Sequence, residues 1–403
     1  MEVEMSILRH CEVRAVSYRP IPRFNTNRII YIEQSPKGIN IASRWYFGHP
    51  LEMSVKKLIL VIGATGVQGR TVISSLLAPQ ADGTPSPWSI RALTRDPTSE
   101  RAQVLSSWGV ELFKGRIDES LDSITPAFEG CYGVYVNIDS FTVGQRIEIY
   151  AGIKLYEQAR RAHIKHFIWS GLDYASKLGN FDPKYRLAFH FDAKGIVGEF
   201  LRSQPSSPDG DSLTWSIIST GPYLENLFGP LLGPLPKREN GVLVWALPTG
   251  DGHIPLISLQ DIGWWARYTF DHRLETSGQE LKIATEMATA EQMVKTFTRV
   301  TGIPAIHKRI PIDEYLATYP GRFTRPMVSG EPDGYTIGDT YRGVYTLMGN
   351  DIVTRDMEWI RRVHPTGHTL ESFIKEKGFD GTLNANFTLL NASHLHAETQ
   401  SGK

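Results

Sequence analysis

Residues 57–70 read Lys57-Leu-Ile-Leu-Val-Ile-Gly-Ala-Thr-Gly-Val-Gln-Gly-Arg70, and this stretch decides the fold. The apolar run from Leu58 to Ile62 has the continuous hydrophobic character of a strand that is buried in a parallel sheet. Three glycines follow at once, in the spacing GxxGxxG, and apolar residues then recur at helical spacing. The sequence therefore predicts a strand, a tight turn and a helix in direct succession.

The turn between this strand and this helix has the form of a phosphate-binding loop. Gly63 permits the turn, Gly66 lets the backbone approach a pyrophosphate, and Gly69 lets helix and strand pack closely. The start of the helix adds unpaired N–H groups and a positive dipole end. A turn needed only for packing is the alternative, but the flanking strand and helix favour a dinucleotide site. The loop residues expected to bind it are Gly63, Ala64, Thr65, Gly66, Val67, Gln68 and Gly69.

Strand and helix patterns alternate from the glycine loop to residue 220. Six strands joined by helical crossovers predict an α/β fold with a right-handed, doubly wound parallel Rossmann sheet. Its ligand would lie at the carboxyl ends of the strands, and residues 56–220 would form the domain. The expected strands are 58–62, 88–94, 110–114, 133–138, 166–170 and 213–219, and the expected helices are about 67–78, 144–162 and 191–204.

The pattern changes after Gly221-Pro222, where prolines cluster and the elements become shorter and mixed. This change predicts a smaller mixed α/β substrate domain over residues 221–383, followed by a polar tail over 384–403. Part of this domain is expected to return to the sheet through residues 253–257, with Asp261 as the cap of the next helix.

Residues 1–55 carry scattered arginines, no sustained periodicity and no apolar core of a secretory signal. Glu2, Glu4 and Glu12 count against a mitochondrial presequence. Met53 leads directly into the first strand, so a mis-assigned start near Met53 is an alternative. We expect an irregular leader without a catalytic role.

The composition is that of a soluble globular protein, with 41% hydrophobic residues and 43 basic residues against 43 acidic ones. This balance gives no bulk attraction to nucleic acid or membrane surfaces, and no apolar run is long enough to span a bilayer. We therefore expect no direct nucleic-acid or membrane partner. Two cysteines favour a reducing compartment, the cytoplasm with the nucleus as an alternative. The scattered histidines predict no metal site, and the oligomeric state stays open.

The end of the second strand distinguishes NADP from NAD. A carboxylate there accepts a hydrogen bond from the ribose 2′-hydroxyl, whereas an arginine pairs with the 2′-phosphate. Arg95 comes first after the strand, and Arg70 and Arg91 are placed to assist. NADP(H) is therefore the expected cofactor. Asp96 is the competing signal, because a shift of one residue in the strand end would exchange the two roles.

Several further segments, in order along the chain, carry a family resemblance. Arg91-Ala-Leu-Thr-Arg-Asp-Pro, His166-Phe-Ile-Trp-Ser-Gly-Leu, His190-Phe-Asp-Ala-Lys-Gly and Thr220-Gly-Pro-Tyr-Leu-Glu-Asn follow the glycine loop. Together they resemble the NmrA-like branch of the atypical short-chain dehydrogenases over about residues 56–380. The resemblance implies a Rossmann domain with a small C-terminal domain and NADP(H) binding. It also implies one of two functions: oxidoreductase, often in secondary metabolism, or redox-sensing regulator of a protein partner such as a transcription factor.

One departure from the family concerns the adenine end of the cofactor. Relatives often carry Asp just after the glycine that ends the third strand, where it meets the adenine edge, but this chain has Arg116 there and Asp118 two residues later. The cofactor-binding residues expected beyond the glycine loop are Arg95, Asp118, Asn137, Lys194, Pro222 and Tyr223.

Short-chain dehydrogenases use a Tyr-x-x-x-Lys pair on the helix after the fifth strand, where lysine holds the nicotinamide ribose and tyrosine exchanges the proton. Tyr150 and Lys154 have this spacing but lie before the fifth strand, so we reject them. The correct connection offers Lys194 with His190 in place of tyrosine, and an imidazole can donate a proton near neutrality. His190 could instead cap the helix or simply pack.

Two residues near the end of the fifth strand complete the candidate catalytic set. Ser170 ends the strand where a substrate carbonyl would lie, and Tyr174 follows as another proton donor. The primary hypothesis is an NADPH-dependent oxidoreductase that reduces a carbonyl or conjugated double bond of a small molecule. The second is a non-catalytic NADPH/NADP⁺ sensor with a regulatory protein partner, which the missing tyrosine favours. The aromatic residues Tyr223, Phe228, Trp245, Trp264 and Trp265 favour the enzyme if they line a substrate pocket, although each can also be ordinary core.

Overall fold

The computed structural model describes residues 27–35, 38–46, 55–209, 212–328 and 334–384. The chain divides into two units, Met1–Val55 and Lys56–Lys403. Within the first unit, expected to be irregular, β1 (Asn27–Ser35) pairs with β2 (Gly38–Tyr46) in an antiparallel ladder. The strands are rich in Ile, Tyr and Trp, residues that favour extended backbone. Residues 1–26, 36–37 and 47–54 of the predicted leader and residues 385–403 of the predicted tail lie outside the described residues.

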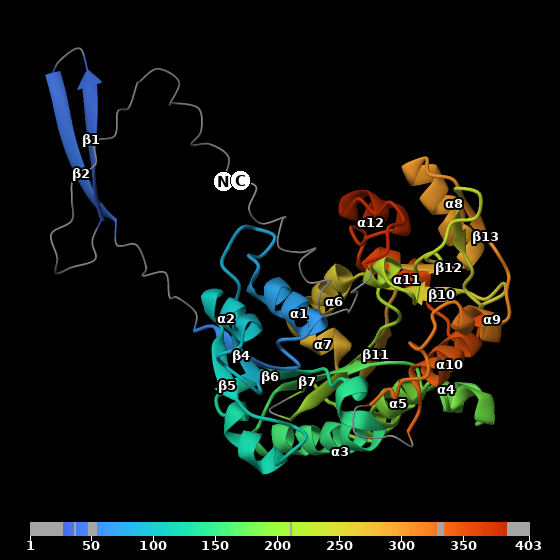
Figure 1. Ribbon diagram of the computed structural model, residues 1–403. Helices are drawn as coiled ribbons and strands as arrows, with labels where there is room; N and C mark the ends of the chain where they lie inside the picture. Colours follow the sequence, from blue (N-terminus) through green and yellow to red (C-terminus); the bar gives the residue numbers. More distant parts are fainter. Residues whose placement is uncertain (1–26, 36–37, 47–54, 210–211, 329–333, 385–403) are drawn as a thin grey trace. The chain divides into compact units, whose positions relative to one another are not determined.

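The second unit is built on a seven-stranded parallel sheet of order β11-β8-β7-β6-β3-β4-β5 (Figure 1). The chain moves outward from β3 through β4 to β5, then returns to the other side of β3 as β6. The predicted doubly wound Rossmann sheet is confirmed, with its switch point between β3 and β6. The strands are β3 (Lys57–Ile62), β4 (Trp88–Thr94), β5 (Glu111–Lys114), β6 (Cys131–Val136), β7 (His166–Gly171), β8 (Thr214–Ser219) and β11 (Gln279–Lys282).

Helices cover both faces of this sheet because its strands are apolar on both sides. Ile59 and Val61 of β3 face one core, which α1 (Val67–Leu77) and α6 (Leu259–Asp271) close. Leu60 and Ile62 face the other core, beneath α3 (Ser140–Arg161) and α5 (Phe189–Arg202). Figure 1 shows α3 and α5 on one side of the sheet and α1 and α6 on the other. The shorter helices here are α2 (Glu100–Ser107), η1 (Leu121–Phe128), α4 (Ala175–Leu178), η2 (Pro183–Tyr185), η3 (Leu224–Phe228) and α7 (Arg273–Thr276).

The C-terminal half contains two small sheets and a third core. β9 (Leu243–Trp245) pairs in parallel with β13 (Ala305–His307), and β10 (Ile254–Leu256) pairs antiparallel with β12 (Glu286–Ala288). Its helices are α8 (Ala290–Thr301), α9 (Ile312–Ala317), α10 (Ile337–Gly349), α11 (Met357–Val363) and α12 (Leu370–Lys377). The boundary predicted at residues 220/221 stays a prediction.

Two details of the C-terminal half differ from the expectation. Residues 254–256 lie in the small β10–β12 sheet, whereas the large sheet gains β11 instead. That strand, Gln-Glu-Leu-Lys, carries only one fully buried apolar side chain, Leu281, so it gave no strand signal. The cap of α6 is Ser258, whose hydroxyl accepts the Asp261 N–H at 3.0 Å, rather than Asp261.

Candidate functional site

At two positions of the glycine loop between β3 and α1, a carbonyl oxygen lies too close for any side chain. Gly63 has φ +81°, and a Cβ there would lie 2.3 Å from the carbonyl oxygen of Asn137. A Cβ on Gly69 would lie 2.2 Å from the carbonyl oxygen of Gly63. At Gly66 the nearest atom would be 3.3 Å away, so internal packing restricts this position much less. The open position is thus the one at which a ligand would approach the backbone.

The start of α1 offers donors for an anion. Its N-cap, Gly66, has no side chain to cap the helix, and its first turn contains no acidic residue. The first amides of a helix have no partner within it, and the dipole end is positive. The Gln68 side chain is engaged by another residue, because its amide Nε2 donates to Ser170 Oγ at 2.9 Å. The loop therefore presents backbone rather than side-chain donors to a phosphate.

The end of β4 lies where the sequence places it, after Thr94, so Arg95 is the first residue beyond the strand and is exposed. The Asp96 carboxylate is occupied by its own turn, since Oδ1 accepts the Thr98 N–H at 2.8 Å and the Thr98 hydroxyl at 2.6 Å. These hydrogen bonds hold the pKa of Asp96 below its usual range. The Asp96 carboxylate is thus already engaged, whereas the Arg95 guanidinium has no hydrogen bond or ion pair with the residues that the structure describes.

Arg70 and Arg101 form a pair of neighbouring cations, of which the sequence predicted only Arg70. Arg70 has a buried Nε without a partner among the described residues, and burial, then the nearby Arg101, lower the pKa of its guanidinium. Two neighbouring cations with an unpaired donor fit a phosphate group. Arg101 was missed, because an arginine at the start of a helix has no distinctive pattern. Arg91, expected to assist, is engaged elsewhere by Glu111 and two backbone carbonyls.

Asp118 is also engaged within the protein. Its carboxylate accepts two hydrogen bonds from the Arg116 guanidinium, from Nε at 3.1 Å and from Nη2 at 2.7 Å. This pairing holds the pKa of Asp118 below its usual range, with the Arg95 charge as a weaker influence. The two oxygens each keep a free lone pair, so the paired carboxylate can still accept a hydrogen bond from an adenine edge.

The Lys194 side chain of α5 lies at the carboxyl ends of β6 and β7. Its Nζ donates to the carbonyl oxygens of Ile138 at 2.9 Å and Ser170 at 3.2 Å, and to Asn137 Oδ1 at 3.3 Å. Glu148 Oε1 lies 2.9 Å from the same nitrogen. The structure therefore brings Lys194, Ser170 and Asn137 together at the switch-point edge.

Glu148 is the residue of this group that the sequence did not reveal. Its side chain is 0% exposed and accepts a hydrogen bond from the Ser140 hydroxyl, besides its ion pair with Lys194. Burial raises the pKa of Glu148, and the Lys194 charge opposes that rise. Within a predicted amphipathic helix, a glutamate reads as a surface residue, so only the three-dimensional contact identifies it.

His190 lies one helical turn before Lys194 on α5, in an aromatic setting. Its ring centroid is 4.8 Å from those of Phe141 and Phe191 and 5.7 Å from that of Phe189. Burial, and then the Lys194 charge, lower the pKa of His190 to about 3. At neutral pH the imidazole is therefore uncharged, and it cannot act as an imidazolium acid.

Ser170 and Tyr174 each contact α5 and are engaged by other parts of the protein. The Ser170 side chain is 2% exposed and its hydroxyl is tied to Gln68, so a substrate carbonyl would have to displace that amide. The Tyr174 side chain packs on Gly195, where an added Cβ would lie 2.5 Å from Tyr174 Cβ. Burial, then the Asp192 charge, raise the pKa of Tyr174, and Lys194 is not among the charges that act on it.

Pro222 and Tyr223 follow β8, and backbone hydrogen bonding joins this segment to Ile257, which lies between β10 and α6. The Pro222 carbonyl accepts the Ile257 N–H at 3.1 Å. Burial raises the pKa of the Tyr223 phenol, to which Tyr135 and Asp139 add. Since those residues lie on and just after β6, Tyr223 also belongs to the carboxyl edge of the sheet.

The five aromatic residues proposed as a substrate pocket do not gather in one place. Phe228 and Trp245 belong to the core of the C-terminal half. Tyr223, Trp264 and Trp265 pack in the core between the sheet and α6. Trp245 and Trp265 are fully buried, whereas Tyr223, Phe228 and Trp264 are partly buried against these cores and Trp264 lines a cavity at the amino ends of the strands, so the five residues do not line one shared pocket.

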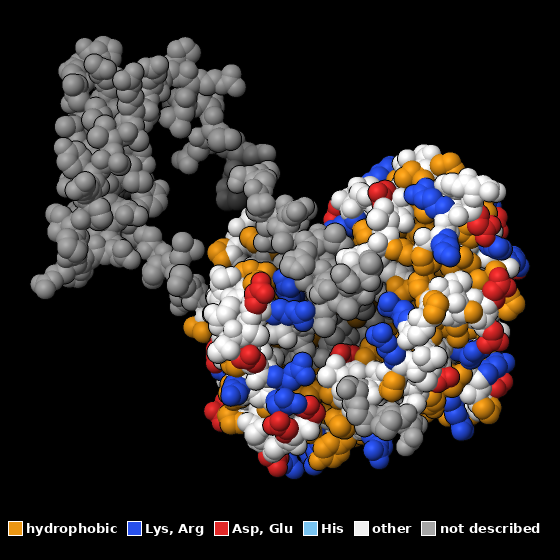
Figure 2. All heavy atoms as spheres, in the orientation of Figure 1, with side chains coloured by type: hydrophobic (Ala, Val, Ile, Leu, Met, Phe, Trp, Pro, Cys, Tyr) orange, Lys and Arg blue, Asp and Glu red, His pale blue; other side chains and the backbone are white. Residues whose placement is uncertain are grey.

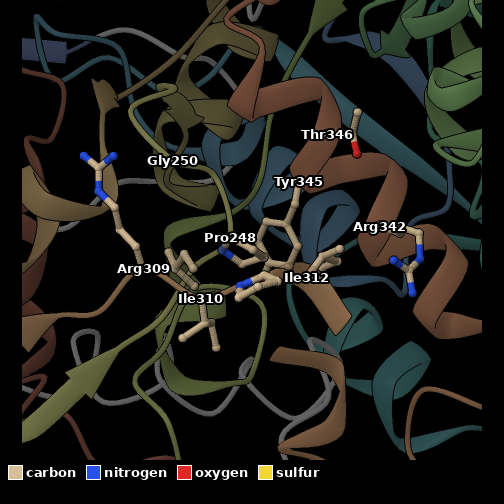
Figure 3. A pocket seen from close by; sticks show the side chains of 10 residues that line it. Pro248, Gly250, Arg309, Ile310, Ile312, Arg342, Tyr345 and Thr346 are labelled. Atoms are coloured by element: carbon tan, nitrogen blue, oxygen red, sulfur yellow. The ribbon is translucent and has the colours of Figure 1, made fainter. Parts of the chain in front are cut away.

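Two other cavities lie away from the predicted site residues. One, of about 210 Å³, is lined by the C-terminal half alone, around Ile310, Ile312 and Tyr345 (Figure 3). The arginines at its rim are paired, Arg309 with Asp251 and Arg342 with Asp313. A larger one, of about 920 Å³, opens at the amino ends of β3 and β4, at the opposite sheet edge from the glycine loop.

The surface and the helices show two further properties. Figure 2 shows basic and acidic side chains interspersed over the face in view, without a continuous patch of either sign. Within the described ranges, no helix is both long and apolar enough to cross a bilayer. Among those same residues, no three His, Cys, Asp or Glu side chains cluster as metal ligands would.

Comparison with known proteins places these features in a family. The NmrA-like family matches residues 55–330. The NmrA-like family domain-containing oxidoreductase malD of Malbranchea aurantiaca is 30% identical over 269 residues, which cover 63% of this chain and 76% of the relative. An NmrA-like family domain-containing protein of Dictyostelium discoideum is 26% identical over 275 residues, covering 66% and 84%.

Solved structures show the same fold. NmrA, a negative transcriptional regulator in complex with NADP, superposes with a TM-score of 0.60 at 19% identity, over 80% of this chain and 95% of that one. An NADPH-dependent quinone oxidoreductase of Escherichia coli in complex with NADPH gives 0.55 at 20% identity, over 79% and 98%. The family match spans well over half of the sequence, and the chain therefore belongs to the NmrA-like family.

Proposed function

We propose that this protein binds NADP(H) across the carboxyl edge of its sheet and reduces a carbonyl or conjugated double bond of a small molecule. The observation that carries the proposal is the meeting of two groups at the switch point. The glycine loop Gly63–Gly69 offers backbone donors, and its Gly63 touches Asn137, whose side chain accepts from Lys194. The oxidoreductase relatives and the NADP(H)-bound structural neighbours support this reading.

The proposed preference for NADP(H) over NAD(H) rests on two positively charged side chains, one just after β4 and one on α1. Arg95 follows β4 directly, and Arg70 has a buried donor without a partner among the described residues. Asp96, the residue that would favour a free 2′-hydroxyl, is held in its own turn. A 2′-phosphate would supply the anion that these cations lack.

When bound, the reduced nicotinamide supplies a hydride. In the proposal, Lys194 holds the nicotinamide ribose beside the ends of β6 and β7. His190, uncharged at neutral pH, acts as a hydrogen-bond donor toward the substrate rather than as an acid. The proton for the substrate oxygen or second carbon would come from solvent.

The test is NADPH consumption by the full chain with a panel of aldehydes, ketones, quinones and enones. We expect turnover with at least one class, and a fall of about a hundredfold in kcat/KM in Lys194→Ala, as for removal of a group that binds the reacting centre. An unchanged rate in Lys194→Ala would remove the lysine from the mechanism. No NADPH consumption with any compound would count against the oxidoreductase.

A second candidate function, a cofactor-gated regulator, is favoured by one observation. The three N–H groups of the Lys194 ammonium already have acceptors within the protein. The His190 imidazole beside it is uncharged at neutral pH and therefore is no proton donor of the imidazolium type. Such a site can hold a nucleotide without turnover. The regulator predicts that capture of a protein partner depends on whether NADPH or NADP⁺ is present, and equal capture with both would argue against it.

A further inference from the structure

Glu148 is a buried carboxylate to which neither the fold nor the proposed chemistry has assigned a task. It lies on α3 just after Gly144, where the backbone leaves helical geometry (φ +78°, ψ 162°). Its side chain is 0% exposed, although an ionised carboxylate is costly to bury without a partner. The helix would be better packed with an apolar residue here if packing were the only requirement.

The two carboxylate oxygens join two elements that approach the cofactor region. Oε1 lies 2.9 Å from Lys194 Nζ on α5, and Oε2 accepts from the Ser140 hydroxyl. Ser140 is the first residue of α3, and the connection from β6 to this helix begins with Asn137, whose backbone abuts Gly63. Glu148 therefore links the lysine to the segment that backs the glycine loop.

The four contacts of the Lys194 ammonium differ in length, and the longest one indicates which acceptor a bound ligand would replace. Glu148 Oε1 and the Ile138 carbonyl lie at 2.9 Å, whereas the Ser170 carbonyl and Asn137 Oδ1 lie at 3.2 and 3.3 Å. The three N–H groups of the ammonium donate to the Ile138 and Ser170 carbonyls and to Asn137 Oδ1, whereas Glu148 Oε1 has no hydrogen-bond partner among the described residues and faces the ammonium as an ion pair. The contact to Asn137 is the longest, and its acceptor is a side chain that can turn away.

We propose that Glu148 is a positioning residue for the nicotinamide half of the cofactor site. Its carboxylate anchors the Lys194 ammonium, so that the N–H now donated to Asn137 Oδ1 turns to a ribose hydroxyl on binding. Ser140 fixes the carboxylate in the orientation that this requires. The inference rests on the proposed NADP(H) binding and adds a residue through which Lys194 acts.

The test compares two ligands that differ only in the half that Lys194 serves. Adenosine 2′,5′-bisphosphate carries the adenosine end of NADPH and lacks the nicotinamide ribose. In Glu148→Gln, which keeps the size and a hydrogen-bond acceptor for Ser140, the dissociation constant of NADPH should rise about tenfold. That of the bisphosphate should stay unchanged. Glu157→Gln, at a partly exposed glutamate of the same helix paired with Arg160, is the matched control and should change neither.

A cycle of variants tests whether Glu148 acts through the lysine. Lys194→Met should weaken NADPH binding and spare the bisphosphate, and adding Glu148→Gln to it should cause no further loss. Ser140→Ala should give a smaller loss of the same pattern. If Glu148→Gln fails to fold, Ser140→Ala carries the comparison with the same two ligands.

The outcomes separate this inference from the proposed function. Unchanged NADPH affinity in Glu148→Gln, or an equal loss for both ligands, overturns the positioning role while NADPH binding by the unaltered chain stands. A further loss in the double variant also overturns it, because Glu148 would then act apart from Lys194. If the unaltered chain binds neither ligand, the proposed function fails, and this inference fails with it.

Discussion

The two halves of the candidate site meet at Asn137 and are held in different ways. The glycine loop is fixed by contact between backbone atoms, and any Cβ at Gly63 or Gly69 would collide with a carbonyl oxygen. Around Lys194 the structure depends on charge, since the ammonium and the Glu148 carboxylate are both buried and face each other. Substitutions should therefore disrupt the glycine loop by steric clash, and the surroundings of Lys194 by the loss of a charge partner.

The largest expected effect is steric, at Gly69. In Gly69→Ala the new Cβ would meet backbone atoms of Gly63 and Ala64 below 3.0 Å, so we expect a loss of about 3 kcal/mol in the free energy of unfolding. NADPH binding should be lost with it. Gly66→Ala is the control, because its Cβ would meet only one atom at 3.3 Å. It should unfold close to the unaltered protein in urea yet bind NADPH more weakly, and a Gly69→Ala midpoint equal to that of Gly66→Ala would contradict the comparison.

The next effect is electrostatic, at Glu148. Glu148→Ala leaves a buried ammonium without its counter-charge, so we expect about 3 kcal/mol of destabilisation in urea unfolding. Glu148→Leu combined with Lys194→Met removes both charges, and it should recover most of that stability although it cannot hold the nicotinamide ribose. If the double variant is as unstable as Glu148→Ala, shape rather than charge holds this half together.

These two halves also differ in how far the sequence revealed them. The glycine loop, its strand and its helix are contiguous, so their spacing carried the prediction, and the end of β4 at Thr94 was placed correctly. The Lys194 group comes from β6, α3, β7 and α5, and no spacing links Glu148 to Lys194 across 45 intervening positions. Strand β11 was missed for a related reason, because its pairing with β8 is a long-range contact of a polar segment.

A third prediction concerns the adenosine end, where charge acts at the surface. Arg95→Ala should weaken NADPH binding about tenfold and leave NADH binding unchanged, because only NADPH has the 2′-phosphate. Arg91→Ala is the control, since that guanidinium is engaged by Glu111 and backbone carbonyls. Equal losses for NADPH and NADH in Arg95→Ala would place the arginine elsewhere on the nucleotide.

The smallest effect is a pH dependence at His190. Its pKa in the folded protein is lowered to about 3, below the unfolded value of about 6.5, so the unfolded chain binds the proton first. Stability from this group is therefore complete above about pH 6.5 and falls as the pH drops toward 3. His190→Phe should retain about 1 kcal/mol more of its neutral-pH stability at pH 5 than the unaltered protein, after allowance for partial exposure.

His166 is the comparison for that measurement. It lies at the amino end of β7, fully buried between Thr214 and Ser216, and burial lowers its pKa to about 3 as well. Acid destabilisation that persists unchanged in His190→Phe would assign the whole effect to His166 and other groups. The aromatic surroundings of His190 would then not keep it uncharged.

The most direct test of the central claim is a tryptophan-fluorescence titration of the full chain with NADPH and with NADH. The account predicts saturable binding of NADPH, clearly weaker binding of NADH, and loss of this difference in Arg95→Ala. Equal affinity for both nucleotides would contradict the assignment of the cations at the end of β4. Binding of neither would contradict the claim that the glycine loop serves a dinucleotide.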